Sequence, residues 1–138
     1  MRLKPWPVVA GILVDSLGSI AVGIIYFMAV IGLQIARGLE VSEEMLDPHA
    51  SITAILGLLL TVAGGFVAGW LARTDEVRHG IAVGVGSVLI WLLLEWAVPA
   101  DGPESIVETI SFFAVIPSAA LGGYAAARMN RRAVRPPL

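Results

Sequence analysis

The 138-residue chain has no cysteine and few charged side chains. The absence of cysteine excludes disulfides, thiolate metal sites and cysteine catalysis. Charged residues make up only 14% of the chain, whereas hydrophobic residues make up 57% and the mean hydropathy is +0.85. Soluble globular domains do not have this composition, so we expect a membrane protein.

The sequence also lacks the motifs of enzymes and of nucleic-acid sites. It has no phosphate-binding loop, no nucleophile–base pair and no paired histidines within an apolar stretch. The arginines near its C-terminus are not interleaved with the aromatic side chains typical of nucleic-acid binding. We therefore expect a protein that is not an enzyme, that has no cofactor or metal site, and that binds no nucleic acid.

Four apolar stretches account for the composition, and each reaches the roughly 20 residues needed to cross a bilayer. They cover residues 6–36, 50–72, 79–98 and 106–127. The length of the chain indicates one domain over residues 1–138. We therefore predict an all-α fold, a polytopic bundle of four transmembrane helices. The first stretch is too long for a signal-peptide core and is expected to remain as a tilted or projecting helix.

Basic residues gather on one side of the predicted helices. The eight residues on this side are Arg2, Lys4, Arg73, Arg78, Arg128, Arg131, Arg132 and Arg135. The two loops on the other side carry seven acidic residues and a single Arg37. The positive-inside rule then places both termini in the cytoplasm, as in a multi-pass protein of the cytoplasmic (inner) membrane. We expect the basic ends to contact anionic lipid headgroups, and residues 131–138 to form a disordered tail.

Small residues recur at four-residue spacing, which places them on one face of each predicted helix. Helices in lipid associate through close backbone contacts at such faces, because lipid supplies no hydrophobic drive between them. We therefore predict helix packing, within or between chains, at Gly11, Gly23, Gly57, Gly65, Gly69, Gly80, Gly84 and Gly122. In the fourth helix Pro117 removes one backbone hydrogen bond, which predicts a kink.

Asp15 is a lone carboxylate inside the first apolar stretch, where burying a charge costs several kcal/mol. It shares a predicted helix face with Ser19. One interpretation is a titrating group that binds a proton or cation during transport. Another is a structural group that hydrogen-bonds to Ser16, Ser19 or a neighbouring helix. An ion pair with an arginine, such as Arg73 or Arg128, is the third.

Glu95 lies between Trp91 and Trp96 at the outer end of the third stretch. Tryptophan is enriched at membrane–water interfaces, so we expect Glu95 to reach headgroup water. The alternatives are a second acid of a proton or cation pathway, or a partner for Arg37.

The segment Gly11-x-x-x-Asp15-x-x-Gly18-Ser19 resembles the first helix of the small multidrug resistance transporters. These four-helix proteins are of similar length, and a glutamate at the position matching Asp15 serves both the proton and the cationic drug. The resemblance is confined to this helix, because the family's later aromatic and proline motifs are not visible here. Residues 64–73 look like the glycine-rich, four-span small membrane proteins of unknown function in bacteria and archaea, which implies no activity.

Two classes of function follow. The sequence favours a non-enzymatic accessory or scaffold subunit, packed through glycine-rich faces into a homo-oligomer or a larger membrane complex. The alternative is a small proton- or cation-coupled transporter or channel with Asp15 as the titrating carboxylate, joined by Ser19 and Glu95. The first class is favoured because only one polar residue is expected deep in the bundle, whereas a transporter needs several converging polar groups.

Overall fold

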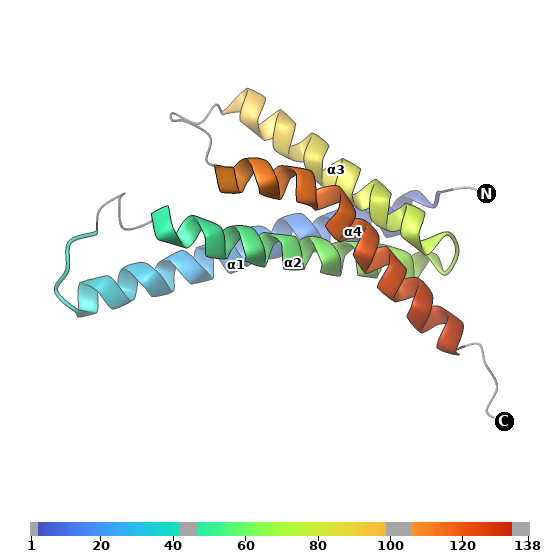
Figure 1. The fold of residues 1–138 in the computed structure, drawn as a ribbon, viewed down its shortest axis with the longest axis horizontal. Helices are drawn as coiled ribbons and strands as arrows, with labels where there is room; N and C mark the ends of the chain where they lie inside the picture. The colour runs from blue at the N-terminus through green and yellow to red at the C-terminus, as the bar shows by residue number, and fades with distance from the viewer. Residues whose placement is uncertain (1–2, 42–46, 99–105, 134–138) are drawn as a thin grey trace.

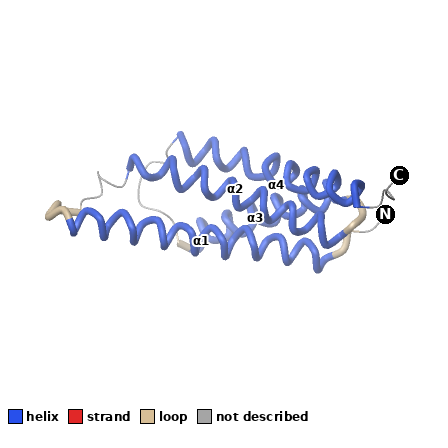
Figure 2. Tube along the Cα trace, turned by 90° about the horizontal axis from the view of Figure 1, so that it is seen from below, coloured by secondary structure: helices blue, strands red, loops and turns tan. Residues whose placement is uncertain are grey.

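The computed structural model of the chain describes residues 3–41, 47–98 and 106–133. Its four helices are α1 (Pro5–Ala36), α2 (Asp47–Ala72), α3 (Glu76–Ala97) and α4 (Ile106–Ala133). All four are long and apolar enough to cross a membrane. The predicted all-α bundle of four helices is therefore confirmed (Figures 1 and 2).

The helices extend beyond the predicted spans by three residues or more at three places. Helices α2 and α3 begin at Asp47 and Glu76, each three residues before its predicted span. Helix α4 continues to Ala133, so the prediction of a disordered tail from residue 131 is wrong for its first three residues. Arg131 and Arg132 lie in the last turn of α4, where positive charges stabilise the negative end of the helix dipole. Residues 134–138 lie outside the described part of the chain.

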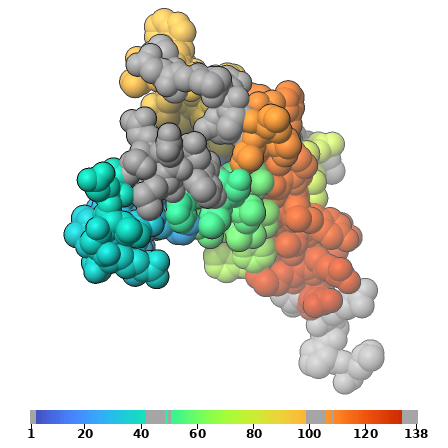
Figure 3. All heavy atoms as spheres, turned by 60° about the vertical axis from the view of Figure 1, so that its left-hand side comes forward, coloured from blue at the N-terminus to red at the C-terminus, as the bar shows by residue number. Residues whose placement is uncertain are grey.

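Helices α1, α2 and α3 come together at one end of the bundle, where the C-terminal end of α4 points away from them, and the tips of α1 and α3 separate toward the other end (Figure 1). We call the first the basic end, since it holds Lys4, Arg73 and Arg78, and the second the far end. Helices α2 and α3 contact each other, and both contact α1 and α4. Among the described residues α1 and α4 do not meet, so they lie at opposite corners. At the far end the tips of α1 (cyan) and α3 (gold) lie well apart (Figure 3).

Close backbone contacts hold the helices together in the half nearer the basic end. A Cβ atom at Gly65 would collide with the carbonyl oxygen of Ala119, and one at Gly122 with that of Val62, so α2 and α4 meet backbone to backbone. Six of the eight predicted glycines lie at such contacts, where an added Cβ would stand under 3.0 Å from another helix or turn. They are Gly11, Gly65, Gly69, Gly80, Gly84 and Gly122.

Gly23 and Gly57 are placed differently. No atom lies within 4 Å of the position that a Cβ would take at either residue. Both belong to the halves of α1 and α2 that diverge toward the far end. Their four-residue spacing therefore does not produce close helix packing within this chain.

Hydrogen bonds between the start of the chain and the α2–α3 turn close the basic end. Lys4 Nζ donates to the carbonyl oxygen of Ala72 over 2.9 Å, which satisfies a free carbonyl at the end of α2. The backbone N–H of Lys4 donates to Nε2 of His79 over 3.0 Å. Because Nε2 accepts, the proton of this fully buried imidazole is on Nδ1, which donates to the carbonyl oxygen of Asp75. His79 is thus neutral.

Pro117 lies inside α4, on a side of the helix that faces away from the bundle. Proline has no N–H to donate and its ring crowds the preceding turn, so it bends helices. Figure 1 shows α4 changing direction partway along its length.

Replacing Gly65 by alanine tests the backbone contact between α2 and α4. In an open helix the change would stabilise by about 0.5–1 kcal/mol. Here the new methyl group meets the Ala119 carbonyl, and overpacking costs about 1–3 kcal/mol. We expect Gly65→Ala to unfold at lower denaturant concentration in micelles. Gly32→Ala is the matched control, because nothing lies within 4 Å of its added methyl. Equal stability of the two variants would contradict the packing described.

Candidate functional site

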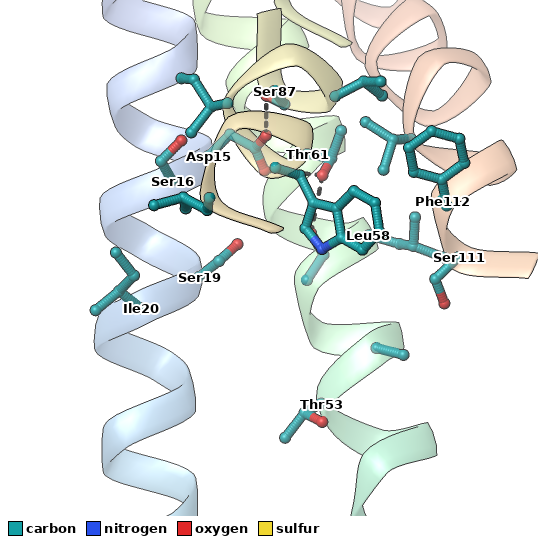
Figure 4. A pocket seen from close by; sticks show the side chains of 17 residues that line it. Asp15, Ser16, Ser19, Ile20, Thr53, Leu58, Thr61, Ser87, Ser111 and Phe112 are labelled. Carbon is teal, nitrogen blue, oxygen red and sulfur yellow. Dashed lines mark hydrogen bonds between the residues drawn. The ribbon is translucent and has the colours of Figure 1, made fainter. Parts of the chain in front are cut away.

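Asp15 is only 5% exposed and lies ten residues after the start of α1, on the side that faces α2 and α3. Its Oδ1 accepts a hydrogen bond from Thr61 Oγ1 of α2 over 2.8 Å. Its Oδ2 accepts a short hydrogen bond from Ser87 Oγ of α3. Figure 4 shows both hydroxyl groups directed at the carboxylate. Three helices are therefore joined at one acidic side chain.

The hydroxyl group of Thr61 has two acceptors within reach. Its Oγ1 lies 2.8 Å from Asp15 Oδ1 and 3.1 Å from the carbonyl oxygen of Gly57. A threonine hydroxyl has one proton to donate and two lone pairs with which to accept. It can donate to an ionised Asp15, or it can donate to Gly57 and turn its lone pairs toward Asp15. Both the charged and the protonated carboxyl group can thus be satisfied without moving a helix.

A cavity of about 490 Å³ begins at Asp15 and extends toward the far end of the bundle. All four helices line it, and most of its wall is apolar. The lining includes an aromatic pair, Trp91 and Phe112, whose ring centroids are 5.2 Å apart. Seven carboxyl- or hydroxyl-bearing side chains also line it, and all are labelled in Figure 4: Asp15, Ser16, Ser19, Thr53, Thr61, Ser87 and Ser111.

Tight helix packing closes the cavity on the side of Asp15 that is nearer the basic end. A Cβ at Gly64 would stand 3.0 Å from Asp15 Cβ and 2.5 Å from the carbonyl oxygen of Gly11. Ala68 and Val83, which flank Gly11, are fully buried. Asp15 therefore lies at the floor of the cavity, at the level where glycine packing ends.

The structure brings together two of the three predicted coupling residues. Ser19 lines the cavity with Asp15. The hydrogen-bond partners of Asp15 are, however, Thr61 and Ser87 of neighbouring helices rather than Ser16 or Ser19 of its own helix. Glu95 lies half-buried near the far end of α3 and does not line the cavity.

The two arginines considered as partners of Asp15 lie elsewhere. Arg73 is exposed in the turn between α2 and α3, and Arg128 is exposed near the end of α4. Both positions are at the basic end, on the far side of the glycine packing. Asp15 is held by neutral hydroxyl groups instead.

Thr61 and Ser87 are the residues that sequence analysis did not assign to the site. Thr61 occupies the small-residue row of α2 between Gly57 and Gly65, so its position on a packing face was visible. A hydroxyl group within such a row, level with an acid on another span, is the signal that would have found it. For Ser87 we see no comparable signal in the sequence.

No family model, curated protein or solved structure matches this chain. The chemistry of the site is therefore argued from its own geometry.

Cysteine labelling tests access to the cavity, and the chain has no native cysteine to interfere. Ser19→Cys places a thiol in the cavity, whereas Leu17→Cys places one at similar depth on the outward face of α1. Only a thiolate reacts with maleimides, and water is needed to ionise the thiol. We expect a membrane-impermeant maleimide to label Ser19→Cys from one side of the membrane and to leave Leu17→Cys unlabelled. Equal labelling of both would contradict a water-accessible cavity.

Proposed function

We propose that the protein is a small integral membrane protein that binds a proton or cation at Asp15 and carries it across the membrane, as a coupled transporter or channel. The observation that supports this is the convergence of hydroxyl groups from four helices on a cavity that ends at a buried carboxylate. Ionisable residues within membrane spans are costly and mark ion and proton pathways.

The geometry of the cavity favours the transporter or channel over the accessory subunit. The sequence favours the accessory role because it predicts only one polar residue deep in the bundle. Six hydroxyl groups, from all four helices, now accompany that residue around one cavity. In addition, six of the glycines expected to mediate assembly contact other parts of the same chain. These faces are therefore not free to bind a partner.

The charge distribution suggests the side from which a cation enters. Under the positive-inside rule the basic end lies in the cytoplasm, so the cavity extends toward the opposite side of the membrane. The loops on that side are acidic, and negative charge around an entrance raises the local concentration of cations. Cations would reach Asp15 from outside, past Ser19 and Thr53. Passage to the cytoplasm then requires the glycine packing to loosen.

The accessory role is a second candidate, and the far half of α1 favours it. Gly23 and Gly32 have open space around them, and large apolar side chains such as Ile25 and Met28 are exposed nearby. Small residues on an uncovered span are suited to contact with another helix. A second copy of the chain or another membrane protein would fit there. This contact is compatible with transport, since it leaves the cavity unchanged.

Flux measurements in proteoliposomes test the proposed function. Vesicles that contain a pH-sensitive dye would receive proton gradients, with and without opposing sodium or potassium gradients. We expect wild-type protein to carry flux and Asp15→Asn to abolish it, because the amide cannot change charge. Glu95→Gln is the matched control, since this acid lies outside the cavity.

Flux through Asp15→Asn equal to that of the wild type would overturn the proposal. A folded wild-type protein that carries no flux, but that purifies with a partner, would favour the accessory role instead.

A further inference from the structure

We infer that the floor of the cavity is a sodium site formed by oxygen atoms of Asp15, Thr61 and Ser87. The inference rests on the proposed function, because it names the ion that Asp15 binds. The three side chains come from three helices, and their oxygen atoms are already within hydrogen-bond distance of one another. A cation at this point would replace hydrogen bonds that the protein makes in its absence.

The donor atoms select a hard cation. The groups that hydrogen-bond to the carboxylate are the hydroxyl oxygens of Thr61 and Ser87, and the second acceptor of Thr61 is the carbonyl oxygen of Gly57. Hard cations take oxygen ligands, whereas zinc and copper sites are built from imidazole and thiolate groups. The described residues include no group of three His, Cys, Asp or Glu that could hold a metal ion. This donor set therefore points to a hard cation rather than to zinc or copper.

The charge at the site selects a monovalent ion. Asp15 is the only ionisable side chain among the residues that line the cavity. One positive charge neutralises it, whereas a divalent cation would leave an uncompensated charge in a medium of low dielectric constant. Asp15 Oδ1 and Thr61 Oγ1 are 2.8 Å apart as hydrogen-bond partners, so they must move apart to hold any cation between them. The smaller sodium ion requires a smaller displacement than potassium.

Thr61 can change from a hydrogen-bond donor to a cation ligand. In the absence of the ion its proton is donated to Asp15. With the ion bound, the proton can be donated to the carbonyl oxygen of Gly57, 3.1 Å away, and the lone pairs of Oγ1 face the cation. The exchange requires only rotation about the C–O bond of the hydroxyl group.

The cavity contains more hydroxyl groups than protonation of Asp15 alone would require. A proton on Asp15 requires only the carboxylate and one acceptor, which Thr61 supplies. The further hydroxyl groups of Ser16, Ser19 and Thr53 face a space large enough for several water molecules. Such water, hydrogen-bonded to the hydroxyl groups, would complete the coordination of a cation. This is the reason for favouring sodium over a proton.

Thermal unfolding of the purified protein in micelles tests the inference, with sodium, potassium or choline chloride at equal ionic strength and fixed pH. A ligand that binds only the folded state raises the melting temperature with its concentration. We expect sodium to raise the wild-type Tm by several degrees, and potassium and choline to raise it less. Asp15→Asn and Thr61→Val should lose the sodium effect, and Thr61→Ser should keep it. Ser118→Ala is the matched control, a serine of α4 outside the cavity.

The outcomes separate this inference from the proposed function. An unchanged wild-type Tm in sodium, or an equal sodium shift in Asp15→Asn, would overturn the sodium site. A choline shift as large as the sodium shift would also overturn it, in favour of a bulkier cation. If proton flux still depends on Asp15 in either case, the proposed function stands without sodium. If Thr61→Val fails to fold, Ser87→Ala takes its place.

Discussion

The backbone contact between α2 and α4 at Gly65 and Gly122 is the constraint on which the rest of the structure depends. It brings the two helices so close that no side chain fits between them. Toward the far end larger side chains such as Trp91 and Phe112 replace the small residues of α3 and α4, and the helices diverge. The cavity is the space that this divergence leaves. Asp15 lies one turn beyond Gly11, where the close helix packing ends and the cavity begins.

The position of Asp15 would be unfavourable without its two hydroxyl partners. A buried carboxylate without hydrogen bonds is among the most costly groups in a membrane span. Thr61 and Ser87 supply donors from two other helices, and the alternative acceptor at Gly57 allows Thr61 to reverse its role. The site is thus satisfied in more than one state of charge. A carboxylate fixed by an arginine would lack this freedom.

The sequence predicted the helices well and the site only in part. Hydropathy and length located the four spans because each helix carries its own signal. Of the partners of Asp15, Thr61 carries a signal as a hydroxyl group in a row of small residues, but Ser87 was not predictable. The pairing depends on how α1 is aligned along α2 and α3, and spacing within one helix does not determine that. For the same reason Ser19 looked like a partner of Asp15, although it only shares the cavity. Gly23 and Gly57 have the same spacing as the packing glycines, but they lie where the helices have separated.

The central claim of the proposal is that Asp15 is a water-accessible carboxylate that binds and releases a proton or cation, rather than a structural group that stays in one state. Infrared difference spectra of the protein in bilayers, recorded across a pH titration for wild type and Asp15→Asn, test this most directly. The account predicts a carboxyl band that is absent from Asp15→Asn and that appears and disappears as the pH is varied. A band of Asp15 that never moves across the titration would contradict it, and would make the side chain structural.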